Sequence, residues 1–228
     1  MFDDTTQPTV TPGYVKCDIS EPVQCPTSRK LRTQCDYYAR VMLKHPYLSE
    51  FHCYPELLHA ALLEADRTVV SYVPQPFRMW VGNRRYTPDV YVVCDGRRRQ
   101  VIELKPRGEM EDELKDPLER YFARNNMQFV VVDNDAILAR RIEAENWLQI
   151  LQILIQAANF PTDPEEEAII TRLSNRSLTL GDIADRGNRD HTYLTEVALF
   201  RLTHKGLVAS SNISEYALGY DTEFRLCD

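Results

Sequence analysis

The feature that most constrains the fold is a group of three strand-forming segments in the first half of the chain. These segments are residues 69–81, 86–93 and 99–105. They are rich in β-branched and aromatic side chains, which favour extended backbone. Asp95-Gly96, between the second and third segments, is a sequence that forms tight hairpin turns, and Gly82-Asn83 marks a turn between the first two. The sequence therefore predicts a three-stranded antiparallel meander.

Helical patterns lie on both sides of this meander. Apolar residues recur at helical spacing in residues 28–44, 55–66, 109–124 and 135–158. The short apolar run 128–133 is typical of a buried strand. Helix, three strands, helix, strand and helix in this order predict an α/β domain at residues 31–160, with a mixed sheet flanked by helices.

The pattern changes after Phe160-Pro161-Thr162 to shorter helical segments. These are residues 163–174, 179–187 and 191–206, followed by a small hairpin that ends in YDTEFRLC. Two short helices around a glycine-containing turn, followed by a longer helix, are typical of a winged helix-turn-helix domain, here at residues 161–228. Residues 1–30 show no sustained period, so we expect an N-terminal arm that orders only on contact with something else.

The charge balance argues against binding to nucleic acid by bulk charge alone. The chain has 228 residues, a formal net charge of -7 and a pI near 5.3. Basic residues nevertheless gather in one stretch that contains Arg97, Arg98, Arg99, Lys105 and Arg107. A local basic stripe beside carboxylates suits a phosphodiester substrate.

Nothing in the sequence suggests export or a membrane. It has no run of roughly 18 apolar residues, and the N-terminus lacks the charged and apolar regions of a secretory signal. We therefore expect a cytoplasmic protein with no membrane association. The six cysteines show neither a CxxC pair nor zinc-finger spacing, so we expect reduced thiols and not a structural zinc site.

Three ionisable side chains interrupt the apolar pattern of the meander. Asp89 stands at the start of the second strand, and Glu103 and Lys105 alternate with apolar residues in the third. Side chains two apart on a strand share a face, so Asp89 can converge on Glu103 and Lys105 from the neighbouring strand. Solvated cross-strand ion pairs often show the same pattern. Charges within an apolar strand are, however, costly to bury without compensation.

Two carboxylates with an open coordination position suit Mg²⁺, which prefers oxygen ligands and keeps waters that phosphate oxygens can replace. A lysine beside such an ion can orient or deprotonate the attacking water and offset charge that builds on the phosphate. The pattern therefore predicts metal-dependent cleavage of DNA by Asp89, Glu103 and Lys105. We expect a Lys105→Ala variant to keep its fold but to cut no DNA.

Four segments of the chain carry a resemblance to a known family. They are PELLHAALLEAD, VVSYVPQPF, RRYTPDVYVV and VIELKPR, within roughly residues 50–107. Together they resemble the catalytic domain of TnsA, the endonuclease subunit of heteromeric bacterial transposases and a member of the PD-(D/E)xK nuclease superfamily. QPF followed by RRYTPD and E-x-K-P is the specific part of the match. The resemblance implies a restriction-endonuclease-like domain at residues 31–160, followed by the winged-helix domain.

The resemblance also implies roles for individual residues. In that family a helix ahead of the strands supplies a further acidic residue, which the resemblance places at Glu56. Glu64, close to two turns later on the same helix, is the competing carboxylate. Lys105 becomes the catalytic lysine. The implied ligands of Mg²⁺, which Mn²⁺ can replace, are Glu56, Asp89, Glu103 and the backbone carbonyl of Leu104.

TnsA-like proteins act within a larger bacterial machinery. They cleave the 5′ ends of the transposon in cut-and-paste transposition, while an integrase-type transposase makes the 3′ cuts and joins them to target DNA. An ATP-using regulator couples the pair to target choice. The resemblance implies that this chain has the same partners, namely transposon-end DNA, the transposase subunit and the ATP-using regulator. Because such partners deliver the subunit to DNA, it needs less positive charge of its own.

Several other residues have two interpretations. Arg84, Arg85 and Arg107 can contact the phosphate backbone or be solvated surface charge. Arg189 is the candidate DNA contact of the C-terminal domain, whose modest basic character suits partner docking with auxiliary DNA contact.

Near Glu56, the sequence offers a possible second cluster of ligands. We expect His52, Cys53 and His59 to pack or hydrogen-bond there, because they form no paired ligand motif. We also expect Phe77 to fill the core, and the role of Gln75 is open.

Two alternative functions remain at this stage. A stand-alone restriction-type or repair-type nuclease would have the same site. A non-catalytic winged-helix adaptor that binds DNA could keep only the scaffold. The intact set of Asp89, Glu103 and Lys105 favours a nuclease over the adaptor.

Overall fold

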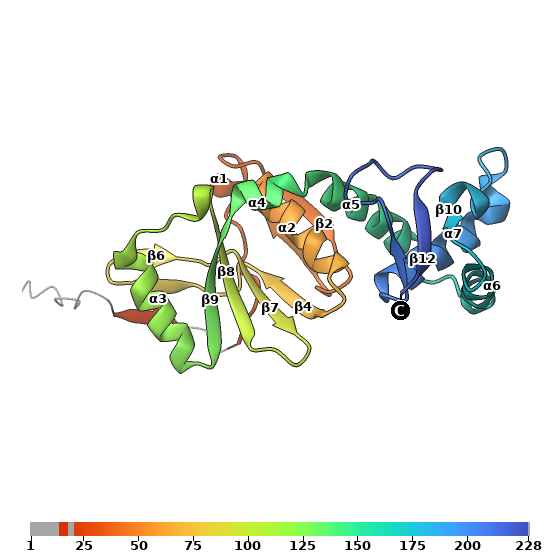
Figure 1. Ribbon diagram of the computed structural model, residues 1–228. Coiled ribbons are helices and arrows are strands. Elements are labelled where there is room, and N and C mark those ends of the chain that lie inside the picture. Colours follow the sequence, from red (N-terminus) through yellow and green to blue (C-terminus); the bar gives the residue numbers. More distant parts are fainter. Residues whose placement is uncertain (1–13, 18–20, 228) are drawn as a thin grey trace, which may run out of the picture.

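The computed structural model describes residues 14–17 and 21–227, which form an α/β unit and a smaller C-terminal unit joined by a long helix (Figure 1). The α/β unit is built on a four-stranded sheet with the order β4-β7-β8-β9. Its strands are β4 (Val69–Pro74), β7 (Val90–Cys94), β8 (Arg99–Lys105) and β9 (Met127–Asp133). The first three are antiparallel and β9 runs parallel to β8. The predicted α/β class and mixed sheet are confirmed.

A separate hairpin interrupts the predicted meander. β5 (Met79–Val81) and β6 (Arg84–Tyr86) pair with each other through the predicted turn, and β5 also pairs with β1 (Val15–Cys17). The predicted strands 69–81 and 86–93 were therefore too long. Gln75 ends β4 because its φ of 40° is incompatible with a continuing strand.

The predicted helix at residues 28–44 is wrong. Only α1 (Arg29–Arg32) is helical, and β2 (Tyr38–Val41) forms a hairpin with β3 (Leu48–Phe51). The apolar spacing over this segment is therefore not that of a helix face. Helix propensity is a weak preference that tertiary contacts override. Here the contact is made by Glu50, which accepts hydrogen bonds from the side chains of Arg32 and Tyr37.

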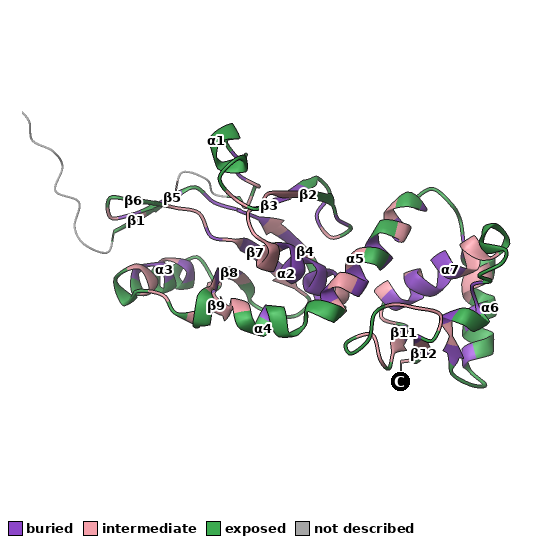
Figure 2. Cartoon of the chain, turned by 90° about the horizontal axis from the view of Figure 1, so that it is seen from above, coloured by how far each residue is buried: buried purple, intermediate pink, exposed green. Residues whose placement is uncertain are grey.

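Helices cover both faces of the sheet. α2 (Tyr54–Ala65) packs against one face and α3 (Asp112–Arg124) against the other. The α2 side buries Val90, Val92, Ile102 and Leu104, and the α3 side buries Tyr91, Val101, Leu118, Phe122 and Phe129. Figure 2 shows buried residues concentrated where α2 meets the sheet. β8 is therefore buried on both faces, as an interior strand is.

The predicted helix at residues 135–158 is divided in two. α4 (Asn134–Ala139) ends at Arg140, and α5 (Arg141–Gln156) continues toward the C-terminal unit (Figure 1). Arg140 has φ -100° and ψ 21°, which ends one helix and begins the next. A short 3₁₀ helix, η1 (Pro106–Gly108), follows β8.

The C-terminal unit combines two helices with a small sheet. Its elements are α6 (Asp163–Leu173), β10 (Leu178–Thr179), η2 (Leu180–Asp182), α7 (Arg189–His204), β11 (Val208–Ser210) and β12 (Glu223–Leu226). The antiparallel strands have the order β10-β12-β11. The helix predicted at residues 179–187 is a single 3₁₀ turn, capped by reciprocal hydrogen bonds between Thr179 and Asp182.

Part of the predicted N-terminal arm lies against the chain itself. We define the arm segment as residues 21–28. Within it, the N–H groups of Val23 and Cys25 donate to the carbonyls of Pro76 and Gln75. The expectation that the arm needs an outside partner to order is wrong for these residues, while residues 1–13 and 18–20 lie outside the described part. In the described ranges, no helix has the length and apolar character to cross a membrane.

Candidate active site

The three predicted strand residues meet at one end of β8. Asp89 immediately precedes β7, and its Oδ2 accepts a hydrogen bond of 2.6 Å from the Leu104 N–H. Val90 pairs with Ile102, so Asp89 lies opposite Glu103 one position further along. The Oε1 of Glu103 lies 2.5 Å from Nζ of Lys105. Because β8 lies between β7 and β9, the cluster sits at the end of an interior strand.

Glu56 joins this cluster from the first turn of α2. Its Oε2 accepts hydrogen bonds from Gln75 Nε2 at 2.8 Å and from the His52 N–H at 3.0 Å, and its Oε1 accepts one from Cys53 Sγ at 3.4 Å. Burial raises the pKa of Glu56, and the charge of Glu103 raises it further. The helix carboxylate is therefore close enough to Glu103 for the two charges to interact.

Glu64, the competing helix carboxylate, has a different environment. It is fully buried, and its Oε1 accepts hydrogen bonds from the N–H groups of Leu43 and Lys44 and from the Tyr72 hydroxyl. Its Oε2 lies 3.2 Å from Nε2 of His204 in α7. Glu64 therefore connects α2 to the loop at residues 43–44 and to α7. Both of its side-chain oxygens already have partners there.

The electrostatics of the cluster show a shortage of positive charge. Burial raises the pKa of Asp89 well above its ordinary value, and the charges of Glu103 and Glu56 add to this rise. Burial alone would lower the pKa of Lys105, but its hydrogen bond to Glu103 and the nearby carboxylates outweigh this effect and raise it. Three carboxylates thus share one ammonium group, an imbalance that a divalent cation would correct.

The donor chemistry of the cluster fits Mg²⁺, because carboxylate oxygens are the hard ligands that this ion prefers. As the side chains stand, residues 14–17 and 21–227 contain no group of three His, Cys, Asp or Glu arranged to enclose a metal ion. Glu103 is turned toward Tyr86, whose hydroxyl donates a hydrogen bond of 2.6 Å to Oε2, while Oε1 faces Lys105. Metal binding would therefore require Glu103 to exchange one of these contacts for the ion.

Two further residues complete the surroundings of the carboxylates. Tyr86 was missed by the sequence reasoning, although it stands in the RRYTPD motif; burial and the charge of Glu103 raise its pKa. Gln75, whose role was open, is 3% exposed and donates its side-chain amide to Glu56. Its backbone N–H donates to the Asp89 carbonyl at 2.8 Å. Gln75 thus links the helix carboxylate to the strand carboxylate.

The histidines and the cysteine near Glu56 pack or form hydrogen bonds, as the sequence predicted. The ring of His52 is hydrogen-bonded to Thr27 Oγ1 at 2.8 Å, and the thiol of Cys53 contacts Glu56. Burial, with the charge of Arg140, lowers the pKa of His59 to about 4. Phe77 fills the core on the α3 side, which confirms its predicted role.

The candidate DNA contacts lie in different places. Arg84 forms an exposed ion pair of 3.0 Å with Glu111, whereas the guanidinium of Arg85 lies 5.1 Å from the centre of the Trp80 ring. Arg107 follows directly after Lys105 and Pro106, in a left-handed conformation with φ 59°. Of these three, Arg84 is therefore the one that is paired with a carboxylate among the described residues.

Arg189 belongs to the C-terminal unit and does not join the cluster. Its guanidinium donates two hydrogen bonds, of 2.9 and 2.8 Å, to the buried carboxylate of Glu196 on the same helix. The candidate DNA contact of this unit is therefore already paired with a carboxylate.

A comparison with known families matches the part of the chain that contains the strand residues of the cluster. The model of the family described as TnsA-like endonuclease N terminal matches residues 66–134, which include Asp89, Glu103 and Lys105. The match begins after Glu56. No curated protein matches the chain. The resemblance drawn from the QPF, RRYTPD and E-x-K-P motifs is thus confirmed, since residues 66–134 match the N-terminal domain of TnsA-like endonucleases.

Proposed function

We propose that the chain is the metal-dependent DNA endonuclease subunit of a heteromeric transposase and cleaves the 5′ ends of the transposon during cut-and-paste transposition. The observation that carries this proposal is the convergence of Asp89, Glu103 and Lys105 in a half-buried cluster within the TnsA-like segment. A mixed sheet between α2 and α3 supports a restriction-endonuclease-like domain at residues 31–160.

Each side chain of the cluster has a proposed role. Glu56, Asp89, Glu103 and the backbone carbonyl of Leu104 would hold Mg²⁺, or Mn²⁺ in its place. The bound ion would supply Lewis-acid activation of water and of a phosphate oxygen. Lys105, whose ammonium lies beside Glu103, would orient the attacking water and offset charge on the phosphate. Tyr86 and Gln75 orient the carboxylates of Glu103 and Glu56.

We propose a winged-helix domain at residues 161–228. The order α6, β10, η2, α7, β11 and β12 supports this, because it places a helical turn before a long helix and a two-stranded wing after it. Since Arg189 is paired with Glu196, docking of the transposase subunit or the ATP-using regulator is the main proposed role, with DNA contact as an auxiliary one.

A nicking assay tests the proposed function. Transposon-end DNA is incubated with the full chain and Mg²⁺ or Mn²⁺, with and without the partner transposase. We expect 5′-end cleavage that Asp89→Ala and Lys105→Ala each reduce by about 10³-fold, the loss typical when a charge-stabilising group is removed from an active site. Cleavage that survives both substitutions would contradict the site assignment. Cleavage without any partner would favour a stand-alone nuclease.

The two helix carboxylates provide a matched pair for this assay. Glu56→Gln is expected to abolish cleavage because it removes a proposed metal ligand. Glu64→Gln is expected to cut normally, because a glutamine oxygen can still accept hydrogen bonds from the N–H groups of Leu43 and Lys44. If Glu64→Gln abolishes cleavage and Glu56→Gln does not, Glu64 is the helix carboxylate of the site.

A further inference from the structure

A cleft of about 640 Å³ opens beside the carboxylates, and the roles proposed above leave its arginines and its tryptophan unassigned. Residues 25–28 of the arm segment form one wall, and the β5–β6 hairpin forms the other. Gln75 and Asp89 also line the cleft, so it reaches the candidate active site. A ligand in this cleft would therefore lie next to the proposed scissile phosphate.

The cleft is lined by two arginines and an exposed aromatic ring. Trp80 and Arg85 are paired across the β5–β6 hairpin, and Trp80 is 37% exposed. Arg78 lies two residues before Trp80, and its guanidinium reaches across to the Pro26 carbonyl of the arm segment at 3.4 Å. Positive charge thus faces the cleft from the hairpin wall.

Little negative charge opposes these arginines. Among the described residues that line the cleft, Asp89 alone is acidic, and neither Arg78 nor Arg85 forms an ion pair with a carboxylate of the described chain. In a protein with a net charge of -7, two uncompensated guanidinium groups beside a carboxylate cluster favour an anionic ligand.

We propose that this cleft binds one DNA strand next to the scissile phosphate, with Arg78 and Arg85 on its phosphates and Trp80 stacked against one of its nucleotides. The inference rests on the proposed nuclease function and names the substrate contacts of the same site. Guanidinium groups hold phosphates through paired N–H donors, and aromatic rings provide platforms for nucleotides of any sequence. The arm segment closes the far side of the cleft, which gives the N-terminal residues a part in holding the substrate.

The test measures binding in the absence of cleavage. Full-length protein and a labelled transposon-end oligonucleotide, single-stranded or duplex, are mixed in EDTA, and fluorescence anisotropy is recorded over a range of salt concentrations. Arg78→Ala and Arg85→Ala are each expected to weaken binding roughly 5-fold to 10-fold and to reduce the salt slope by about 1, the loss of one phosphate contact. Arg85→Lys keeps the charge and is expected to keep the slope.

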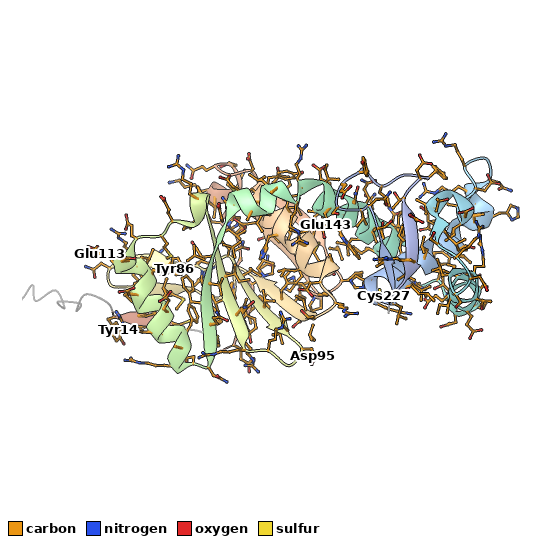
Figure 3. The ribbon with its side chains drawn as sticks, viewed as in Figure 1. Tyr14, Tyr86, Asp95, Glu113, Glu143 and Cys227 are labelled. Carbon is orange, nitrogen blue, oxygen red and sulfur yellow. The ribbon has the colours of Figure 1, made fainter. Side chains whose placement is uncertain are left out.

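Arg97→Ala is the matched control. It removes the same charge from an exposed position in the turn that holds Asp95, labelled in Figure 3, at the end of the β7–β8 hairpin away from Asp89 and Glu103. The basic stretch of the sequence therefore does not form one stripe beside the carboxylates, and Arg97 lies at its distant end. It is expected to change neither the affinity nor the salt slope. Thermal melts of all variants check that each one is folded.

Intrinsic fluorescence gives a second readout, because the chain has two tryptophans and Trp147 is only 5% exposed. DNA is expected to quench the wild-type emission, and Trp80→Phe is expected to abolish the quenching. The proposal is overturned if wild-type protein binds no DNA, if Arg78→Ala and Arg85→Ala behave like Arg97→Ala, or if quenching survives Trp80→Phe. Normal binding without cleavage in the nicking assay would instead contradict the proposed function and leave the cleft assignment standing.

Discussion

At the scale of single residues, Gln75 adopts a backbone conformation that favours glycine. Its φ is 40°, its N–H donates to the Asp89 carbonyl, and its own carbonyl accepts the Cys25 N–H at 2.9 Å. Its side-chain Oε1 is buried with no hydrogen-bond partner in the described structure. Strain and an unpartnered buried oxygen at one position are expected where function, and not stability, selects the residue.

Replacement of Gln75 tests this interpretation. Gln75→Ala removes the amide that donates to Glu56, so we expect the affinity for Mn²⁺ to fall by about 10-fold to 100-fold, as it does when a group that orients a metal ligand is lost. Isothermal titration calorimetry measures this directly. Gln100→Ala, on β8 at the end away from the cluster, is the control and is expected to bind Mn²⁺ normally. Equal affinity in both variants would refute an orienting role for Gln75.

Tyr86 and Gln75 also show what the sequence did not reveal about the site. Alternation along one strand and a hairpin turn were enough to bring Asp89, Glu103 and Lys105 together. Tyr86 and Gln75 contact their carboxylates across 17 and 19 residues of chain. Their roles depend on where the β5–β6 hairpin and α2 lie in space, and no local pattern specifies that placement.

At the scale of elements, α2 and β8 were predicted correctly because the signal lies in their own residues. Apolar residues recur at helical spacing in residues 55–66, and β-branched residues follow the Asp95-Gly96 turn in residues 99–105. The segment at residues 28–44 has a similar apolar spacing, but its contacts with β3 and Glu50 favour a short helix and a strand. The break at Arg140 has no glycine or proline to mark it. Local patterns thus predicted the elements whose own residues form the core, and they failed where a distant partner decides the backbone.

The helix α2 carries a titratable group whose effect on stability can be predicted. Burial, with the charge of Arg140, lowers the pKa of His59 from 6.5 to about 4. Between these values the unfolded chain binds a proton that the folded chain does not, so stability decreases as the pH falls through this window. We expect His59 to account for a loss of about 2 kcal/mol in the free energy of unfolding between pH 7 and pH 5.

Urea denaturation of wild type and His59→Gln at both pH values checks this prediction. Because other groups also titrate, the loss of unfolding free energy between pH 7 and pH 5 is measured in each protein, and the two losses are compared. The variant should lose about 2 kcal/mol less than wild type over this interval. An identical loss in both would show that His59 is not protonated differently on unfolding.

At the scale of the whole molecule, α5 belongs to both units. One continuous core runs from α2 through α5 to α7, and Trp147 and Leu151 lie within it. Asn146 is 1% exposed and fastens the loop of residues 213–218 to α5. Its Nδ2 donates to the carbonyls of Ile213 and Tyr216, and its Oδ1 accepts the Leu218 N–H.

Loss of this buried amide should destabilise the chain strongly. Asn146→Ala leaves three backbone groups without partners, so we expect the free energy of unfolding to fall by about 3 kcal/mol. For a chain of this size the melting temperature should decrease by roughly 6–12 °C. Differential scanning calorimetry measures the change, with Asn159→Ala at an exposed position as the control. A shift no larger than that of the control would contradict the proposed importance of Asn146.

The helix shared by the two units has a consequence for where the proposed nuclease would cut. The distance from the C-terminal unit to Lys105 is set by a length of α-helix and not by a flexible linker (Figure 1). A DNA end or partner subunit held by that unit would therefore meet the carboxylates at a constant offset. In the proposed nuclease, such a fixed offset would determine which phosphodiester bond is cut, and the nuclease unit would not need to read the bases beside the cut.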